Sequence, residues 1–277
     1  SSQFATIAGR WFADSGVNAR PAKVYMSTES PGSPGISRGL PPGMPAKGRS
    51  FGTGKGLPFP LVRIPDFPPV GGYLPTSFLD WEGHVVSVVF MIGCNFRCPF
   101  CHNVPLATGM AEGLNTGAVL SDIWRRRLFL DGAVISGGEP TLYPDLEELL
   151  EWFRETAQIP VKLDTNGSRP EVLDQLVRRG LVDAVAMDVK APWEKYSILS
   201  GVPVEPDRIR SSIEILRSLQ VAVEFRTTFV PGLLTIEDLR RIRLQLDGDP
   251  RWVVQLFRPE HALDPGLRDI APPAREE

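Results

Sequence analysis

The chain has 277 residues, of which 42% are hydrophobic and 23% are charged, and its formal net charge is -3 at pH 7. These values are ordinary for a protein that buries a sizeable core, and they argue against gross disorder of the chain as a whole. The small negative charge supplies no broad attraction for nucleic acid or anionic lipid. The sequence contains neither an apolar run of ~20 residues nor an amino-terminal signal core. We therefore predict a cytoplasmic protein that binds neither nucleic acid nor membrane.

The amino-terminal quarter of the chain differs from the rest in composition. Residues 1–72 are crowded with proline and glycine, most densely at 30–35 and 39–43, and they show no sustained helical or strand period. Such a stretch buries too little apolar surface to offset the entropy lost on ordering. We expect an irregular extension over residues 1–72 and one folded domain over residues 73–277.

From Val85 onward, short apolar runs alternate with amphipathic segments, as in repeated β-α units around a parallel sheet. The apolar runs suit strands that are buried on both faces. Six strands are predicted, at Val85–Ile92, Ala133–Ser136, Val161–Asp164, Ala184–Asp188, Val223–Thr228 and Val253–Phe257. The layout predicts an α/β fold, a partial (β/α)6 TIM-like barrel. The functional residues of such a fold should lie at the carboxyl ends of its strands.

Three helices between these strands have clear sequence signals. The first extends from Asp145 to about Thr156, with apolar residues at the i, i+3, i+4, i+7 spacing of one buried stripe. The second begins near Pro170 and ends at Gly180, which are the usual places for those two residue types. The third starts at Thr235, in a capping-box-like sequence.

All three cysteines of the chain lie within eight consecutive residues directly after the first predicted strand, at Cys94, Cys98 and Cys101. Thiolates are soft ligands that suit iron–sulfur clusters, and a compact loop can wrap three of them around one [4Fe–4S] cubane. Three cysteines leave one of the four irons open. An open iron can coordinate a small molecule, and S-adenosylmethionine offers the amino and carboxylate groups of its methionine end.

Other interpretations of the cysteines stay open on residue type alone. A structural zinc site would need a fourth ligand, which His102 could supply as a Cys3His set. Residues 98–102 also fit the C-x-x-C-H pattern of covalent haem attachment. In that case Cys94 would have no role in binding the haem. The cysteines could also be simple buried hydrophobic residues, or form a disulfide, which is less expected in a cytoplasmic protein.

The cysteine loop resembles that of the radical S-adenosylmethionine superfamily, Cys-x3-Cys-x2-Cys with an aromatic residue before the last cysteine. Phe100 occupies that aromatic position, and the resemblance covers about 190 residues, from near Leu74 to about Pro265. The opening at residues 76–83 and the segment 101–103 look most like anaerobic ribonucleoside-triphosphate reductase-activating proteins. Pyruvate formate-lyase-activating enzymes share much of this pattern.

The resemblance implies an α/β partial barrel in which the cysteines are the metal ligands and residues after the strands bind the cofactor. The implied cofactor-binding residues are Phe100, His102, Gly137, Gly138, Glu139, Asp164, Thr165, Asn166, Asp188, Lys190 and Arg226. Gly137, Gly138 and Glu139 look like the segment that receives the methionine amino group.

The last strands carry weaker motifs. Arg226 could pair with the methionine carboxylate, and Gln255 is a possible pocket residue. Without the resemblance, Asp188 and Lys190 could equally form a structural ion pair. Arg226 could then have a plain surface role.

The function implied by the resemblance is that of an oxidoreductase that uses the cluster and S-adenosylmethionine. A reduced cluster gives one electron to the sulfonium, releasing methionine and a 5′-deoxyadenosyl radical. In an activase, this radical takes hydrogen from a backbone glycine of a glycyl radical enzyme, such as an anaerobic reductase. A flavodoxin- or ferredoxin-like protein would donate the electron. No protein acid or base is required, so no catalytic residue is assigned.

Two alternatives to activase function stay open. A radical enzyme of this kind could act on a small molecule or a peptide, or the chain could be a non-catalytic metal-binding or electron-transfer protein. Two features depart from the pattern: the long extension, and the lack of any cysteine for a second cluster.

Overall fold

The computed structural model describes residues 18–21 and 67–270. The strands of these residues form one sheet in the order β1-β8-β7-β6-β5-β4-β3-β2. Its six consecutive central strands are parallel: β3 (Val86–Met91), β4 (Gly132–Gly137), β5 (Val161–Thr165), β6 (Ala184–Asp188), β7 (Ala222–Phe229) and β8 (Trp252–Leu256). Each lies within one residue of its predicted ends, which confirms the α/β class.

Two edge strands flank the parallel core. β1 (Asn18–Pro21) pairs parallel with β8, and β2 (Val70–Ser77) pairs antiparallel with β3. The expectation of an irregular extension over residues 1–72 is therefore wrong at both of these strands, and a boundary at residue 72 falls inside β2. The rest of that extension lies outside the described residues, and the division of the chain into two domains stays a prediction.

The two edge strands, which were not predicted, lack the usual sequence signals of a β-strand. β1 has four residues and ends in proline, and β2 contains two glycines and a proline. The glycines of β2 have a packing reason. A Cβ on Gly71 would lie 2.5 Å from Cγ1 of Ile92, and a Cβ on Gly72 would lie 3.2 Å from Cδ2 of Phe90. Glycine thus lets β2 pack closely against side chains at the end of β3, although it weakens the strand pattern.

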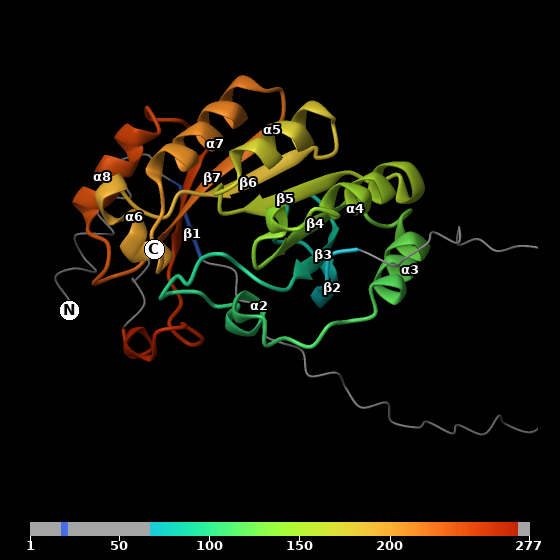
Figure 1. The fold of residues 1–277 in the computed structure, drawn as a ribbon, viewed down its shortest axis with the longest axis horizontal. Helices are drawn as coiled ribbons and strands as arrows, with labels where there is room; N and C mark the ends of the chain where they lie inside the picture. Colours follow the sequence, from blue (N-terminus) through green and yellow to red (C-terminus); the bar gives the residue numbers. More distant parts are fainter. Residues whose placement is uncertain (1–17, 22–66, 271–277) are drawn as a thin grey trace, which may run out of the picture.

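The helices follow the strands in alternation, and Figure 1 shows α4, α5, α7 and α8 along one side of the curved sheet. The α-helices are α2 (Val104–Thr108), α3 (Thr116–Arg126), α4 (Leu146–Trp152), α5 (Pro170–Arg178), α6 (Tyr196–Ser200), α7 (Pro206–Ser218) and α8 (Ile236–Gln245). Short helical turns occur at η1 (Pro140–Leu142), η2 (Phe153–Ala157), η3 (Trp193–Lys195) and η4 (Pro265–Leu267). No helix in the described part of the chain is long and apolar enough to span a membrane.

The three predicted helices are confirmed. α4 continues into the π-helical turn η2, so together they cover the predicted span, and Gly180 follows α5 with φ +62°. The side chain of Thr235 accepts a hydrogen bond from the backbone N–H of Asp238, and the carboxylate of Asp238 accepts one from the backbone N–H of Thr235. This reciprocal pair is the predicted capping box.

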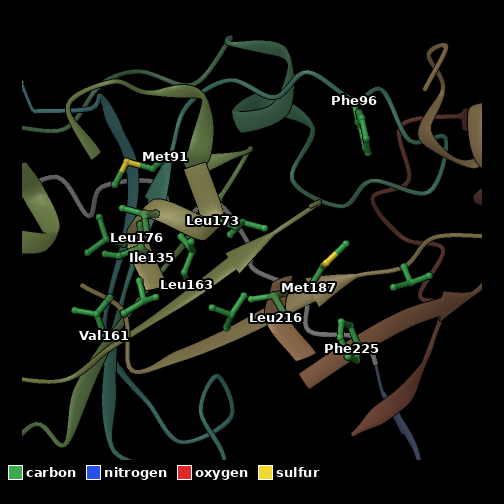
Figure 2. Close-up of a cluster of buried hydrophobic side chains, with 14 of the residues drawn as sticks. Met91, Phe96, Ile135, Val161, Leu163, Leu173, Leu176, Met187, Leu216 and Phe225 are labelled. Carbon is green, nitrogen blue, oxygen red and sulfur yellow. The ribbon is translucent and has the colours of Figure 1, made fainter. Parts of the chain in front are cut away.

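The two faces of the sheet differ in chemistry. Figure 2 shows Ile135 and Leu163 of the strands gathered with Leu173 and Leu176 of α5 in the main apolar core. Because successive side chains on a strand point to opposite faces, Asp164, which follows Leu163, points away from this core. One polar side chain from each of β4–β7 lines the same cavity: Ser136, Asp164, Asp188 and Arg226.

Candidate functional site

A cavity of about 990 Å³, its open mouth included, lies at the carboxyl ends of the parallel strands. Every predicted site residue except Glu139 lines it: Cys94, Cys98, Phe100, Cys101, His102, Gly137, Gly138, Asp164, Thr165, Asn166, Asp188, Lys190 and Arg226. The structure therefore brings together residues that are as many as 132 positions apart in sequence, from Cys94 to Arg226. Their roles toward a ligand stay predictions.

The cysteine loop, residues 94–101, joins β3 to α2 and is fixed from several sides. The backbone N–H of Arg97 donates to the carbonyl oxygen of Ser200 at the end of α6 (2.7 Å). The carbonyl oxygen of Pro99 accepts a hydrogen bond from the backbone N–H of Asp264 (2.8 Å). These contacts hold the loop between α6 and the segment that follows β8.

His102 adds a third anchor at the end of the same loop. Its Nε2 is hydrogen-bonded to the carbonyl oxygen of Arg258, and its ring stacks on Phe257 with ring centroids 5.7 Å apart. Burial lowers the pKa of His102, although the contact with Arg258 opposes that shift. The ring therefore connects the cysteine loop to the segment that follows β8.

Gly137 and Gly138 have a reason for being glycine that needs no ligand. The N–H of Gly138 donates to the carbonyl oxygen of Met91 (2.9 Å), and a Cβ on Gly138 would lie 1.8 Å from the oxygen of Gly93. Gly137 has φ +112°, and a Cβ there would lie 2.4 Å from the nitrogen of Met91. Both glycines let the end of β4 touch the backbone that leads into the cysteine loop.

Glu139 is the predicted cofactor-binding residue that the structure places behind the cavity wall. It is fully buried, and its carboxylate accepts hydrogen bonds from the hydroxyls of Thr141 (2.5 Å) and Thr165 (2.8 Å) and from the backbone N–H of Asn166 (2.6 Å). Burial raises the pKa of Glu139, and these hydrogen bonds oppose the rise. Its carboxylate thus fixes the loop after β5, which corrects the expectation of a carboxylate facing the cavity.

A network of ion pairs forms one wall of the cavity. Arg226 donates from Nε to Oδ1 of Asp188 (3.0 Å) and from a terminal nitrogen to Oδ2 of Asp164 (3.2 Å). Lys190 donates from Nζ to Oδ2 of Asp188 (3.2 Å). Arg226 and Asp188 are direct partners in the β6–β7 register. The suggested ion pair of Asp188 and Lys190 is confirmed. A surface role for Arg226 is wrong, because only 8% of its side chain is exposed.

The charges in this wall stabilise one another. Burial opposes the charge of Arg226, but Asp164 and Asp188 raise its pKa above the usual range. Burial likewise opposes the charge of Asp188, but Lys190 and Arg226 hold its pKa below the usual value. The wall therefore presents fixed charges of both signs, which suits a ligand that carries both an ammonium and a carboxylate group.

We expect Arg226→Met to lower the free energy of unfolding by about 3–5 kcal/mol, because it leaves two carboxylates without their shared buried partner. Urea unfolding would measure the change. The matched control is Arg240→Met, which removes an arginine that is 57% exposed and paired with Glu237 on the surface of α8. That control should cost less than ~1 kcal/mol. Equal effects of the two substitutions would contradict the structural importance of the network.

All three thiols are free, and they border the same cavity. Burial raises the pKa of Cys94 and of Cys98 to about 11 each, and it also raises the pKa of Cys101. The thiols therefore carry protons at neutral pH until a metal displaces them. Three cysteines spread around one cavity suit a cluster in which each cysteine ligates a different iron. The donor set fits a [4Fe–4S] cluster.

The zinc alternative needs His102 as the fourth ligand of a Cys3His set. His102, the suggested fourth zinc ligand, directs Nε2 to the carbonyl oxygen of Arg258. Haem attachment would use only Cys98 and Cys101, and Cys94 would have no role in it. Cys94 borders the same cavity as the other two cysteines.

Several further residues line the cavity without having been assigned to it from the motifs: Phe96, Asn103, Ala107, Ser136 and Thr228. The possible pocket residue Gln255 also lies there. Strand alternation could have found Thr228, because it lies two residues after Arg226 and so shares its face. Thr228 is also the direct partner of Gln255 in the β7–β8 register.

Comparison with known proteins identifies similar sequences. Residues 88–245 match the family model described as the radical SAM superfamily. A proposed glycyl-radical enzyme activating enzyme of Methanocaldococcus jannaschii is 34% identical over 212 residues, which cover 75% of this chain and 88% of that protein.

Two further comparisons are more distant. The pyruvate formate-lyase-activating enzyme of Streptococcus mutans is 30% identical over 189 residues, covering 62% of this chain and 71% of that protein. Among solved structures, Streptococcus suis SuiB bound to its precursor peptide SuiA aligns with a TM-score of 0.42 and 19% identity. That alignment covers 58% of this chain and 35% of SuiB.

Proposed function

Because the chain belongs to the radical SAM superfamily and is homologous to glycyl-radical enzyme activating enzymes, we propose that it activates a glycyl radical enzyme. Cys94, Cys98 and Cys101 would hold one [4Fe–4S] cluster beside bound S-adenosylmethionine. When bound and reduced, the cluster supplies one electron to the sulfonium, which yields methionine and a 5′-deoxyadenosyl radical. The observation that carries the proposal is that three free thiols and a wall of paired charges share one cavity.

The charged wall would orient the methionine end of the cofactor. Lys190 supplies a cation that is buried and held by Asp188, so it can meet a carboxylate without a large reorganisation. Asp164 borders the same wall and can accept a hydrogen bond from the amino group or from a ribose hydroxyl. The hydroxyl of Thr165 is directed to Glu139, so Thr165 would contact the cofactor through its backbone.

The apolar part of the cavity would exclude water from the reacting atoms. Phe96 and Phe100 are buried and border the space beside the cysteines. The Phe100 ring centroid lies 5.8 Å from Nζ of Lys190, so an apolar surface directly adjoins the charged wall. These two rings would keep water away from the atoms that react.

The target that the comparisons favour is a backbone glycine of a partner glycyl radical enzyme. The cavity has an open mouth, and a flexible loop of a partner could enter it. The chain would also receive one electron from a flavodoxin- or ferredoxin-like protein. No residue of the cavity is assigned as a catalytic acid or base, since hydrogen abstraction by the radical requires neither.

The test uses the full chain, reconstituted with iron and sulfide without oxygen and reduced with dithionite. We expect iron and sulfide to be bound, and S-adenosylmethionine to be converted to 5′-deoxyadenosine. Addition of a candidate partner should give a glycyl radical signal in electron paramagnetic resonance, absent when the partner's glycine is alanine.

Other outcomes would point to other functions. Cofactor cleavage without any glycyl radical would favour a small-molecule or peptide substrate, and no cleavage would favour a non-catalytic metal protein. Uptake of zinc or haem in place of iron and sulfide would overturn the proposal.

A further inference from the structure

We infer that Asn166 tunes the reduction potential of the proposed cluster by donating its side-chain amide to the sulfur of Cys94. The inference rests on the proposed ligation of a cluster by the three cysteines. Nδ2 of Asn166 lies 3.9 Å from Sγ of Cys94, which is the length of a weak hydrogen bond to a neutral thiol. Ligation of iron removes the thiol proton, and a thiolate accepts hydrogen bonds more strongly than a thiol.

The orientation of the Asn166 amide is determined by its neighbours. Its Oδ1 accepts a hydrogen bond from the backbone N–H of Ser168 (2.9 Å). A backbone N–H can only donate, so Oδ1 must face it and the amide nitrogen must face the cysteine loop. The second amide hydrogen is donated to Oδ1 of Asn95 (2.9 Å). Both hydrogens thus point to the loop that carries Cys94.

The surrounding packing keeps this amide in place. Asn166 is 5% exposed, and its backbone N–H donates to the buried carboxylate of Glu139 (2.6 Å). Asn95 in turn donates from Nδ2 to the hydroxyl of Ser168 (2.9 Å). Asn95, Asn166 and Ser168 therefore form a closed hydrogen-bond network between the cysteine loop and the loop after β5.

The direction of the effect follows from charge. An added electron increases the negative charge on the cluster and its thiolate sulfurs, so an N–H donor stabilises the reduced form more than the oxidised form. Loss of the donor should lower the reduction potential. The backbone N–H of Phe96 also donates to Sγ of Cys94 (3.3 Å), and it would remain in any side-chain variant. Asn166 is thus a positioning residue that acts on the cluster through Cys94.

The experiment is a redox titration of the reconstituted full chain without S-adenosylmethionine, followed by electron paramagnetic resonance of the reduced cluster. Asn166→Ala and Asn166→Ser both remove the amide, and the serine variant keeps a polar side chain. At a fixed solution potential, we expect the ratio of reduced to oxidised cluster to fall about tenfold, which corresponds to ~59 mV for one electron. Iron and sulfide content should equal that of the wild-type protein.

The matched control is Ser168→Ala. It removes the hydroxyl that Asn95 donates to but keeps the backbone N–H that orients Asn166, so the potential should stay at the wild-type value. A shift of equal size in this control would overturn the inference, as would an unchanged potential in both Asn166 variants. Loss of the cluster in both variants would also overturn it, because a tuning donor is not needed for ligation. Failure of the wild-type protein to bind a cluster would instead overturn the proposed function itself.

Discussion

Replacement of Cys98 by alanine is expected to reduce the iron and sulfide content of the reconstituted protein to background and to abolish 5′-deoxyadenosine formation. The chain has only three cysteines, so no fourth thiol can take the vacant position. His102, the nearest alternative ligand in sequence, uses Nε2 to hold the carbonyl oxygen of Arg258. Chemical analysis of iron and sulfide, with chromatography of the nucleoside product, would measure both losses.

The same substitution should leave the fold intact. Cys98 is 7% exposed and packs with the main apolar core, so loss of its sulfur should lower the free energy of unfolding by only about 1 kcal/mol. Urea unfolding of the cluster-free proteins would separate this small cost from the loss of the cluster. A Cys98→Ala protein that retained its iron and sulfide would contradict the assignment of Cys98 as a ligand.

The predictable part of the fold was the part with regular apolar patterning. β4 and β6 are short, buried runs flanked by loops, and their residues could be assigned within one position because strands buried on both faces have few polar residues. The cavity followed from the same pattern, since the ends of neighbouring parallel strands meet at one edge of a sheet. The motif at Asp188 therefore had to lie beside Arg226 once β6 and β7 were paired.

The features that escaped prediction depend on tertiary contacts. β1 is a strand because β8 offers it a free edge, and nothing in residues 18–21 signals that pairing. The role of Glu139 could not be foreseen either, because a carboxylate beside two glycines suits a cationic ligand as well as it suits two threonine hydroxyls. Which of these partners it meets depends on how β4 and β5 lie side by side.

The second prediction with a large expected effect concerns the contact between Gly138 and Gly93. Gly138→Ala would place Cβ 1.8 Å from the carbonyl oxygen of Gly93, and that oxygen also accepts a hydrogen bond from the backbone N–H of Glu139 (2.8 Å). Backbone cannot rotate away as a side chain can, so the whole cysteine loop must shift. We expect a loss of about 3 kcal/mol in the free energy of unfolding, together with poor uptake of iron and sulfide.

The matched control for this prediction is Gly113→Ala, because nothing lies within 4 Å of a Cβ at that position and its φ is not positive. That variant should unfold within ~1 kcal/mol of the wild-type protein and bind a normal cluster. Urea unfolding and iron analysis of both variants would test the pair. If Gly138→Ala behaved like the control, the glycines after β4 would not be what sets the position of the cysteine loop. Their presence would then have to be explained by close approach of the cofactor alone. If Gly138→Ala loses stability and iron as expected, the backbone contact between the segments that follow β3 and β4 is itself part of the cluster site.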